Sequence, residues 1–261
     1  MAEFGRRPWW AYLRAARDPR RWRAIRRLPR VAGPVPQVLR GYLLRRGAMP
    51  AEVQLRTPTG RVPVALRHVH DYATIAEILA EDVYPVATTD RVVVDIGANI
   101  GVFSVFALTR HPDVRVHAFE PVPENLALLR RNLAPFGDRV TIHETAVAAE
   151  DGEVSFGVEP TGRYGGIGVE TAERITVRTR AIAALLEDVL AREGRIDVLK
   201  MDVEGLERDL LAAVPAAVAA RIGRVEVEWS HPDLAGLEPW AGAGFAVLGG
   251  PTTWVLERPA G

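Results

Sequence analysis

The chain has 261 residues, 48% hydrophobic and 25% charged, which is typical of a globular protein with one large domain or one domain and a small appendage. It contains no cysteine, which excludes disulfides, thiolate metal sites and a cysteine nucleophile, and is compatible with a reducing compartment. No apolar run reaches the roughly 20 residues of a membrane-spanning helix, and no secretory signal is recognisable, so we expect a cytoplasmic protein.

The net charge of zero conceals an uneven distribution. The first 46 residues hold thirteen arginines against Glu3 and Asp18, which leaves this segment near +11 and the remainder near −11. Apolar residues recur there every three or four positions on either side of Pro19, and residues 37–46 predict a further short helix. We therefore expect residues 1–50 to form a basic, Arg/Trp-rich helical extension that packs on the domain that follows or contacts a partner or an anionic surface.

The next segment, residues 51–90, begins a domain that we expect to extend to residue 261. Residues 53–66 predict a strand pair around the turn-prone Pro58-Thr59-Gly60. Residues 71–83 predict a helix with Ile75, Ile78 and Leu79 on one face. We expect these elements to cover the ligand site of the core that follows.

From residue 91 onward, apolar runs alternate with helical stretches, a pattern typical of parallel strands joined by crossover helices. Strands are predicted over 92–96, 115–119, 140–144, 196–201, 224–229, 245–248 and 253–256, and helices over 102–110, 124–134, 182–192, 206–220 and 234–243. An inserted hairpin is predicted from 154–156 and 175–178, around a Gly-rich loop at 162–168. The expected fold class is α/β, with a Rossmann-like core at 91–261 and a seven-stranded, mostly parallel sheet whose last strand is antiparallel.

The loop after the first of these strands, VVVDIGANIG, indicates a cofactor site. Gly97 and Gly101 allow a tight turn into a helix, but the middle glycine of the dinucleotide pattern G-x-G-x-x-G is missing. The carboxylate of Asp95 would repel a pyrophosphate, whereas it suits the ammonium or sulfonium group of S-adenosylmethionine. Glu120, which ends the next strand, can accept hydrogen bonds from both hydroxyls of a ribose. The alternatives are a helix cap for Glu120 and an NAD-linked oxidoreductase for the chain.

From His70 to its C-terminus, the chain resembles the FkbM-type methyltransferases. The segments that carry this resemblance are VVVDIGANIGVFS, HAFEPVPENLALLRRNL, ETAVAAEDGEVSF, IDVLKMDVEGLE and VEVEWSH. The resemblance implies a class I methyltransferase fold and O-methylation of sugars, polyketides or other natural products with S-adenosyl-L-methionine. The cofactor-binding residues that it implies are Asp95, Gly97, Asn99, Gly101, Phe103, Glu120, Pro121, Ala146, Asp202 and Tyr72. Asp71, Tyr72 and Tyr84 resemble an acidic-aromatic stretch of the family that could close over the cofactor.

Two places can supply a base for a weakly acidic hydroxyl. Asp202 ends the fourth main strand, and Lys200 shares its strand face, so the lysine can pair with Asp202 or Glu204 and hold the acceptor side in place. His231 follows the next strand near Glu228, which can orient it. We expect catalytic roles for Asp202, His231 and Lys200, and substrate contacts from Glu204, Glu228 and His231.

Further alternatives concern metals, the methylated atom and the role of the arginines. Asp202 and Glu204 could instead bind a divalent ion, although simple pairing with Lys200 is favoured and no metal is expected. His68 and His70 alternate on an edge strand and are not expected to be ligands. Methylation of nitrogen or carbon, and a membrane- or RNA-tethered binding protein, are the competing functions. The expected partner is a hydroxylated small molecule, free or carrier-linked, and not DNA; an oligomer is compatible with the sequence.

Overall fold

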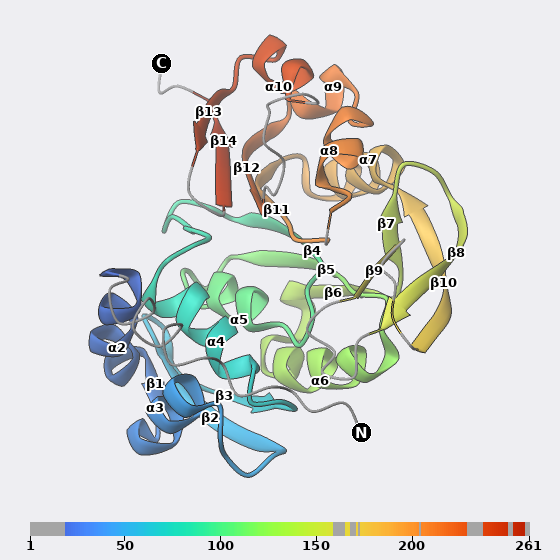
Figure 1. Ribbon diagram of the computed structural model, residues 1–261. Helices are drawn as coiled ribbons and strands as arrows, with labels where there is room; N and C mark the ends of the chain where they lie inside the picture. The colour runs from blue at the N-terminus through green and yellow to red at the C-terminus, as the bar shows by residue number, and fades with distance from the viewer. Residues whose placement is uncertain are drawn as a thin grey trace.

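The computed structural model describes residues 19–158, 165–167, 171, 173–203, 205–228, 237–249 and 253–258. Its centre is a seven-stranded sheet with the strand order β13-β14-β12-β11-β4-β5-β6 (Figure 1). The parallel strands are β4 (Val92–Ile96), β5 (Arg115–Phe119), β6 (Val140–His143), β11 (Ile196–Met201) and β12 (Ile222–Glu228). The last strand, β14 (Thr253–Glu257), lies antiparallel between β12 and β13 (Ala246–Gly249). The predicted mostly parallel sheet with an antiparallel last strand is thus confirmed.

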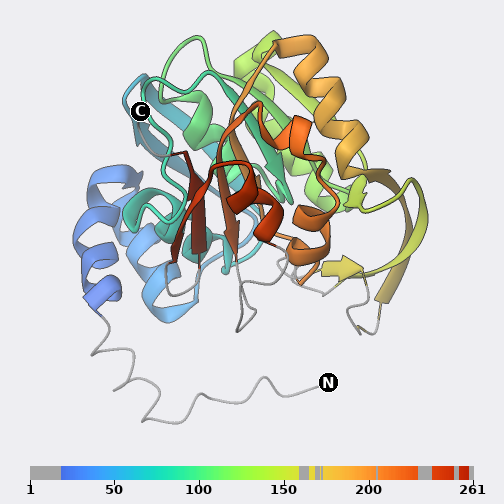
Figure 2. The ribbon, with the colours of Figure 1, turned by 90° about the horizontal axis from the view of Figure 1, so that it is seen from above.

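Helices cover both faces of this sheet (Figures 1 and 2). On one face lie α4 (Asp71–Ile75), the π-helix η1 (Ala76–Ala80), α5 (Val102–Leu108), α6 (Pro123–Leu133) and the 3₁₀-helix η2 (Ala134–Arg139). On the other lie α7 (Ile182–Glu193), α8 (Glu207–Ala212), α9 (Ala216–Ala219) and α10 (Glu238–Gly242). Because the central strands are covered on both sides, every residue of β4 and β11 is buried, which explains why most of their residues are apolar.

One predicted helix, 206–220, is wrong as a single element. The chain forms α8 and α9 instead, and Pro215 stands between them in an extended conformation. Proline has no N–H to donate and its ring crowds the preceding turn, so it kinks or ends a helix, and here the helix ends before Pro215. Helix α10 lies within the predicted 234–243, whose first residues are outside the described part of the chain.

A second, four-stranded sheet has the order β7-β10-β8-β9. The predicted hairpin is confirmed and extended in β8 (Gly152–Val158) and β10 (Glu173–Ala181). The short strands β7 (Ala146–Ala148) and β9 (Gly165–Ile167) were not predicted, and β9 lies in the stretch expected to be a Gly-rich loop. Three residues are too few to show an alternating pattern, so these strands depend on the neighbours with which they pair.

The N-terminal part packs on the outer side of α4 and η1 (Figure 1). Its elements are α2 (Pro19–Val31), β1 (Ala32–Gly33), α3 (Val35–Leu44), β2 (Ala51–Thr57) and β3 (Gly60–Leu66), and β2 and β3 confirm the predicted strand pair. Leu28 and Val38 belong to the same hydrophobic core as Phe103 of α5. From residue 19 onward, the predicted extension therefore shares a core with the rest of the chain, whereas residues 1–18 lie outside the described part. Among the described residues, none of the helices has the length and apolar character that crossing a bilayer requires.

Candidate functional site

A cavity of about 340 Å³ opens at the carboxyl ends of the central strands, the edge at which open α/β sheets bind ligands. Three parts of the chain surround it. The residues that end or follow the strands include Gly97, Glu120, Asp202 and Glu228. The N-terminal wall includes Asp71, Thr74, Glu77, Ile78, Glu81 and Tyr84, and the second sheet adds Phe156, Val158 and Ile167.

The loop from β4 to α5 is held against the neighbouring strand ends. The backbone N–H groups of Gly97 and Ala98 donate to the carbonyl of Phe119 at 3.1 and 3.0 Å. Gly97 has φ +76°, and a Cβ there would lie 2.0 Å from the carbonyl oxygen of Asp202. A Cβ on Gly101, with φ +87°, would lie 2.7 Å from Cδ1 of Leu129. Both glycines are therefore required by the packing of the protein itself, and Gly101 does not line the cavity.

Glu120 is buried and holds this loop while facing the cavity. One carboxylate oxygen accepts from the N–H of Asn99 at 2.8 Å, and the other accepts from the N–H of Val122 at 3.0 Å and from Nδ2 of Asn125 at 3.2 Å. Burial raises the pKa of Glu120, although these donors and Lys200 oppose the shift. Because a carboxylate offers about four acceptor sites, Glu120 retains capacity for a further donor, such as a ribose hydroxyl of a bound nucleoside.

Lys200 is the only lysine of the chain, and it lies buried between two carboxylates. Its Nζ lies 3.2 Å from Oδ1 of Asp95 and 3.7 Å from Oδ2 of Asp202, and donates to the carbonyl of Gly97 at 2.9 Å. Burial alone would lower the pKa of Lys200, but the charges of Asp95 and Asp202 outweigh it and the pKa is raised. Lys200 therefore stays protonated and positions its neighbours. It does not remove a proton from a substrate.

Asp95 lies beneath the cavity, which corrects its predicted contact with the cofactor. Its side chain is fully buried, and its second oxygen accepts from Oγ of Ser104 at 2.6 Å. The ammonium that it neutralises is Lys200, its direct neighbour in the register of β4 and β11. A positive ligand in the cavity would therefore interact with Asp95 only at longer range.

Tyr84 lines the cavity near Asp202 and Glu228. Its ring packs edge-on against Phe103 with centroids 5.7 Å apart, and Nζ of Lys200 lies 5.6 Å from its centroid. Burial, together with the charges of Asp202 and Glu228, raises the pKa of Tyr84 well above its usual range. The phenol therefore stays protonated and can donate a hydrogen bond into the cavity.

Tyr72, in contrast, does not line the cavity, so its predicted contact with the cofactor is corrected. It points toward α3, where a Cβ on Gly41 would lie 2.1 Å from its ring, and its hydroxyl accepts from Nε2 of Gln37 at 3.0 Å. Tyr72 thus links α4 to α3, on the side of the cavity wall that faces away from the cavity. Asp71, the preceding residue, lines the cavity and accepts from the N–H groups of Arg67 and His68 at 2.8 and 2.9 Å.

The remaining predicted residues divide into two groups. The cavity brings together Lys200 and the predicted ligand contacts Gly97, Asn99, Phe103, Glu120, Pro121, Ala146, Asp202 and Glu228. His231 and Glu204 lie outside the described residues. His68 and His70 stack with centroids 5.6 Å apart, away from the cavity, and no metal-binding group of three or more side chains occurs among the described residues.

Sequence reasoning missed the contribution of the second sheet. Phe156, Val158 and Ile167 line the cavity, as do Thr145 and Val147 after β6. Phe156 and Val158 belong to β8 of the predicted hairpin, and Ile167 belongs to β9, which was not predicted. Nothing in the local pattern shows that this sheet folds back over the strand ends.

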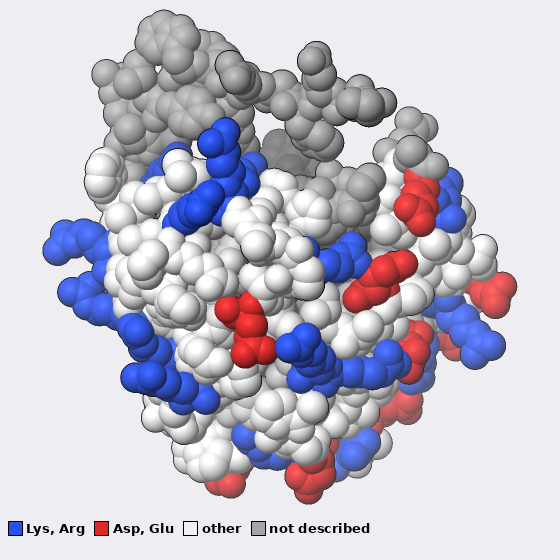
Figure 3. All heavy atoms as spheres, turned by 90° about the horizontal axis from the view of Figure 1, so that it is seen from below, with Lys and Arg blue, Asp and Glu red and all other residues white. Residues whose placement is uncertain are grey.

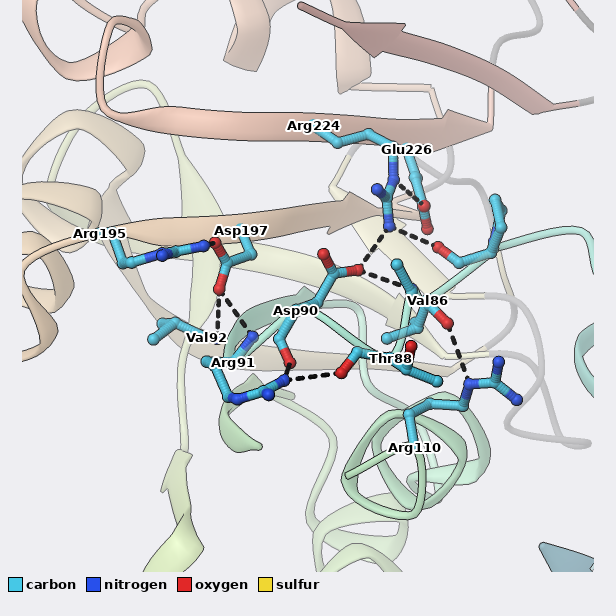
Figure 4. A network of polar contacts seen from close by, with 12 residues as sticks. Val86, Thr88, Asp90, Arg91, Val92, Arg110, Arg195, Asp197, Arg224 and Glu226 are labelled. Atoms are coloured by element: carbon cyan, nitrogen blue, oxygen red, sulfur yellow. Dashed lines mark hydrogen bonds and ion pairs between the residues drawn. The ribbon is translucent and has the colours of Figure 1, made fainter. Parts of the chain in front are cut away.

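A polar network behind the cavity holds the segment that follows Tyr84 (Figure 4). Arg224 on β12 donates to the carbonyl of Pro85 at 2.7 Å and to Asp90 at 2.8 Å. Its Nε donates to Oε1 of Glu226 at 2.7 Å. Arg110 donates to the carbonyl of Val86 at 2.9 Å. These contacts fix residues 85–90 against the sheet and so set the position of the adjoining wall.

Glu226 makes this network sensitive to pH. The side chain is fully buried and its Oε2 has no hydrogen-bond partner. Burial raises the pKa of Glu226 from 4.5 to about 8, although Arg224 opposes the shift. Because the folded pKa exceeds the unfolded one, the contribution to stability is complete below about pH 4.5 and is lost as the pH rises through about 8.

We expect Glu226→Gln to flatten this pH dependence, because the amide does not titrate. The wild-type free energy of unfolding should fall between these pH values more steeply than that of the variant, by up to about 1.4 kcal/mol per pH unit. Urea unfolding across this range measures both slopes. Glu153→Gln, at an exposed position of β8, is the matched control. Equal slopes for wild type and Glu226→Gln would contradict the expectation.

Comparison with known proteins adds independent information. Residues 95–240 match the family model described as the methyltransferase FkbM domain. The chain is 31% identical to the 31-O-demethyl-FK506 methyltransferase FkbM of Streptomyces tacrolimicus, over 73% of this chain and 89% of the relative. It is 29% identical to the 2-O-methyltransferase NoeI of Sinorhizobium fredii, over 47% and 57% of the two chains. Among solved structures, a precorrin-6y C5,15-methyltransferase from Geobacter metallireducens aligns with 17% identity and a TM-score of 0.41, over 69% of this chain and 85% of that one.

Proposed function

The chain belongs to the FkbM methyltransferase family, and from this premise we propose that it transfers the methyl group of S-adenosyl-L-methionine to a hydroxyl oxygen of a sugar, polyketide or other natural product. The observation that carries the proposal is the division of one cavity between two carboxylates on different strands. Glu120 lies at one end of the cavity and has an acceptor site left for a nucleoside hydroxyl. Asp202 lies at the other end, beside Lys200. The membership in a methyltransferase family excludes the NAD-linked alternative.

The cofactor supplies an electrophilic methyl group when it is bound. Within the chain, Glu120, Asn99, Pro121 and Ala146 line one end of the cavity. They would hold the nucleoside of the cofactor, and the carboxylate of Glu120 would orient its ribose. Phe119 and Val122 add apolar surface, which excludes water from this end. Asp95 and Lys200 neutralise one another underneath and keep the floor rigid.

At the acceptor end, Asp202 would take the proton of the acceptor hydroxyl. The bound cofactor would supply the methyl group to the oxygen of that hydroxyl and leave as S-adenosylhomocysteine. Lys200, at 3.7 Å, holds the carboxylate in place. Tyr84 donates a hydrogen bond to the acceptor, and Glu228 accepts one from a neighbouring hydroxyl. Positioning of the acceptor oxygen behind the methyl carbon supplies much of the rate, and the base adds to it. His231 and Glu204 remain predicted contacts of the acceptor.

Oxygen is favoured over nitrogen or carbon as the methylated atom because the names of two relatives specify O-methylation chemistry. The lining of the acceptor end agrees with this choice. Carboxylates and a phenol, as found in Asp202, Glu228 and Tyr84, are suited to hydroxyl groups, which both donate and accept hydrogen bonds.

Calorimetry with S-adenosylhomocysteine tests the cofactor half of the proposal. Glu120→Gln should weaken binding by about tenfold to a hundredfold, because it removes a charged acceptor and places an amide donor among the N–H groups of Asn99 and Val122. Glu124→Gln, at an exposed position of α6 four residues away, should bind as the wild type does. Equal affinities for both variants would overturn the assignment. Transfer of labelled methyl groups to a panel of hydroxylated acceptors, with amine-bearing analogues as the comparison, tests the acceptor half.

A further inference from the structure

Helices α2 and α3 form a strongly basic surface that the methyl transfer does not use. Residues 19–46 hold nine arginines and no acidic residue. We call the exposed arginines of this segment the arginine face: Arg23, Arg26, Arg27, Arg30, Arg40, Arg45 and Arg46. Figure 3 shows blue side chains along the left of the molecule, where α2 and α3 lie in Figure 1, with no red side chains among them.

The packing of α2 keeps these arginines in solvent. Ala24 and Leu28, four residues apart, are fully buried against the domain, so the apolar stripe of the helix is already occupied. Arg23, Arg26 and Arg30 stand on its outer side. A partner therefore meets charged side chains on a fixed helix and not an unoccupied apolar groove.

Several arginines of residues 19–46 lack a carboxylate partner among the described residues. Arg21, Arg23, Arg26 and Arg40 form no ion pair with any described residue, and Arg27 donates to a carbonyl, that of Ala80, at 3.2 Å. Some exposed arginines elsewhere do have a carboxylate partner, as in the pair Arg131–Glu52 at 3.0 Å. Clustered charge of one sign without partners creates a field that attracts an anionic surface.

Exposed hydrophobic side chains accompany the arginines. Trp22 is 55% exposed and Leu44 is 61% exposed. Of the three large hydrophobic side chains that stand exposed among the described residues, these two belong to α2 and α3. Tryptophan and arginine together are the combination that suits the headgroup region of a bilayer, where the ring lies among headgroups and the guanidinium contacts phosphate.

The arginine face is also coupled to the cavity. Helix α2 packs on η1, where Arg27 contacts the carbonyl of Ala80. The other side of η1 supplies Glu77 and Ile78 to the cavity wall. A nucleic acid extending from the face into the cavity would meet the carboxylates of Glu77, Glu81 and Glu228, whereas a flat surface would touch only the helices. These observations favour a membrane surface over a nucleic-acid strand as the partner.

We propose that the arginine face docks the protein on a bilayer surface that contains anionic lipids. The cavity would then lie one helix away from the membrane surface. This inference goes beyond methyl transfer, and vesicle binding can be measured without cofactor or acceptor. Failure of docking would therefore leave the proposed reaction untouched.

Co-sedimentation of the full chain with vesicles tests the proposal. The protein should bind vesicles of phosphatidylcholine with phosphatidylglycerol, should bind pure phosphatidylcholine much more weakly, and should lose binding as salt is added. The double variant Arg23→Gln/Arg26→Gln should reduce the partition coefficient by about thirtyfold. The control Arg178→Gln/Arg192→Gln removes the same charge from exposed positions on β10 and α7 and should bind as the wild type does.

Circular dichroism and cofactor binding establish that the variants are folded. Equal binding of the two double variants, or equal binding to neutral and anionic vesicles, would overturn the proposal. It would also be overturned if the protein ignored vesicles but bound labelled oligouridylate in a manner that depended on Arg23 and Arg26, since nucleic acid would then be the partner.

Discussion

Asp202→Asn is expected to lower the turnover number by about a hundredfold to ten-thousandfold, the usual contribution of a positioned base. Asparagine preserves the size of the side chain but cannot take the proton of the acceptor hydroxyl. Asp202 lines the acceptor end of the cavity, and its carboxylate is held by Lys200 at 3.7 Å. The loss should therefore appear in turnover, while calorimetry shows little change in the affinity for S-adenosylhomocysteine.

The matched control is Asp209→Asn, which makes the same change at an exposed position of α8 and should retain wild-type turnover. The assay is initial-rate methyl transfer to the best acceptor from the panel. Unchanged turnover in Asp202→Asn would show that another group accepts the proton. Loss of affinity for S-adenosylhomocysteine to the same extent as turnover would instead make Asp202 a cofactor ligand.

Lys200→Met is expected to destabilise the fold by about 3–5 kcal/mol, the typical cost of leaving one partner of a buried ion pair without the other. Asp95 is fully buried and depends on the ammonium at 3.2 Å. Methionine fills most of the volume but carries no charge and cannot donate to the carbonyl of Gly97. Urea unfolding followed by circular dichroism measures the loss.

A double-mutant cycle separates this charge effect from packing. Asp95→Asn/Lys200→Met should be more stable than the sum of the two single changes predicts, because it removes both charges. Arg180→Met, which breaks the exposed pair with Asp188 at 2.9 Å, should cost less than about 1 kcal/mol. Additive losses in the cycle would mean that Asp95 and Lys200 contribute independently.

The central sheet could be predicted because its signal is local. Each strand of the core is a short apolar run between helical stretches, and β4, β5 and β11 begin and end where the sequence indicates. The local sequence pattern failed to predict elements whose formation depends on a neighbouring strand or on a single proline. β9 exists because β8 lies beside it, and Pro215 divides a stretch whose apolar spacing suits one helix.

The site could be predicted only in part, for a related reason. Spacing along the chain placed Glu120 and Asp202 at strand ends, and both line the cavity. It could not show that Lys200, 105 residues after Asp95, would neutralise that carboxylate and separate it from a ligand. Nor could it choose between Tyr72 and Tyr84, because the choice depends on α3, which holds Tyr72 through Gly41 and Gln37.

The position of β14 has a consequence for the order in which the sheet is completed during synthesis. β13 pairs only with β14 among the described strands, and β14 comes later in the chain. While a ribosome is still making residues 253–257, β13 has no edge to join and β12 exposes one side. The edge of the sheet is therefore closed only after β13 has emerged, and a chain interrupted before residue 253 would present an open, apolar strand edge of the kind that promotes aggregation.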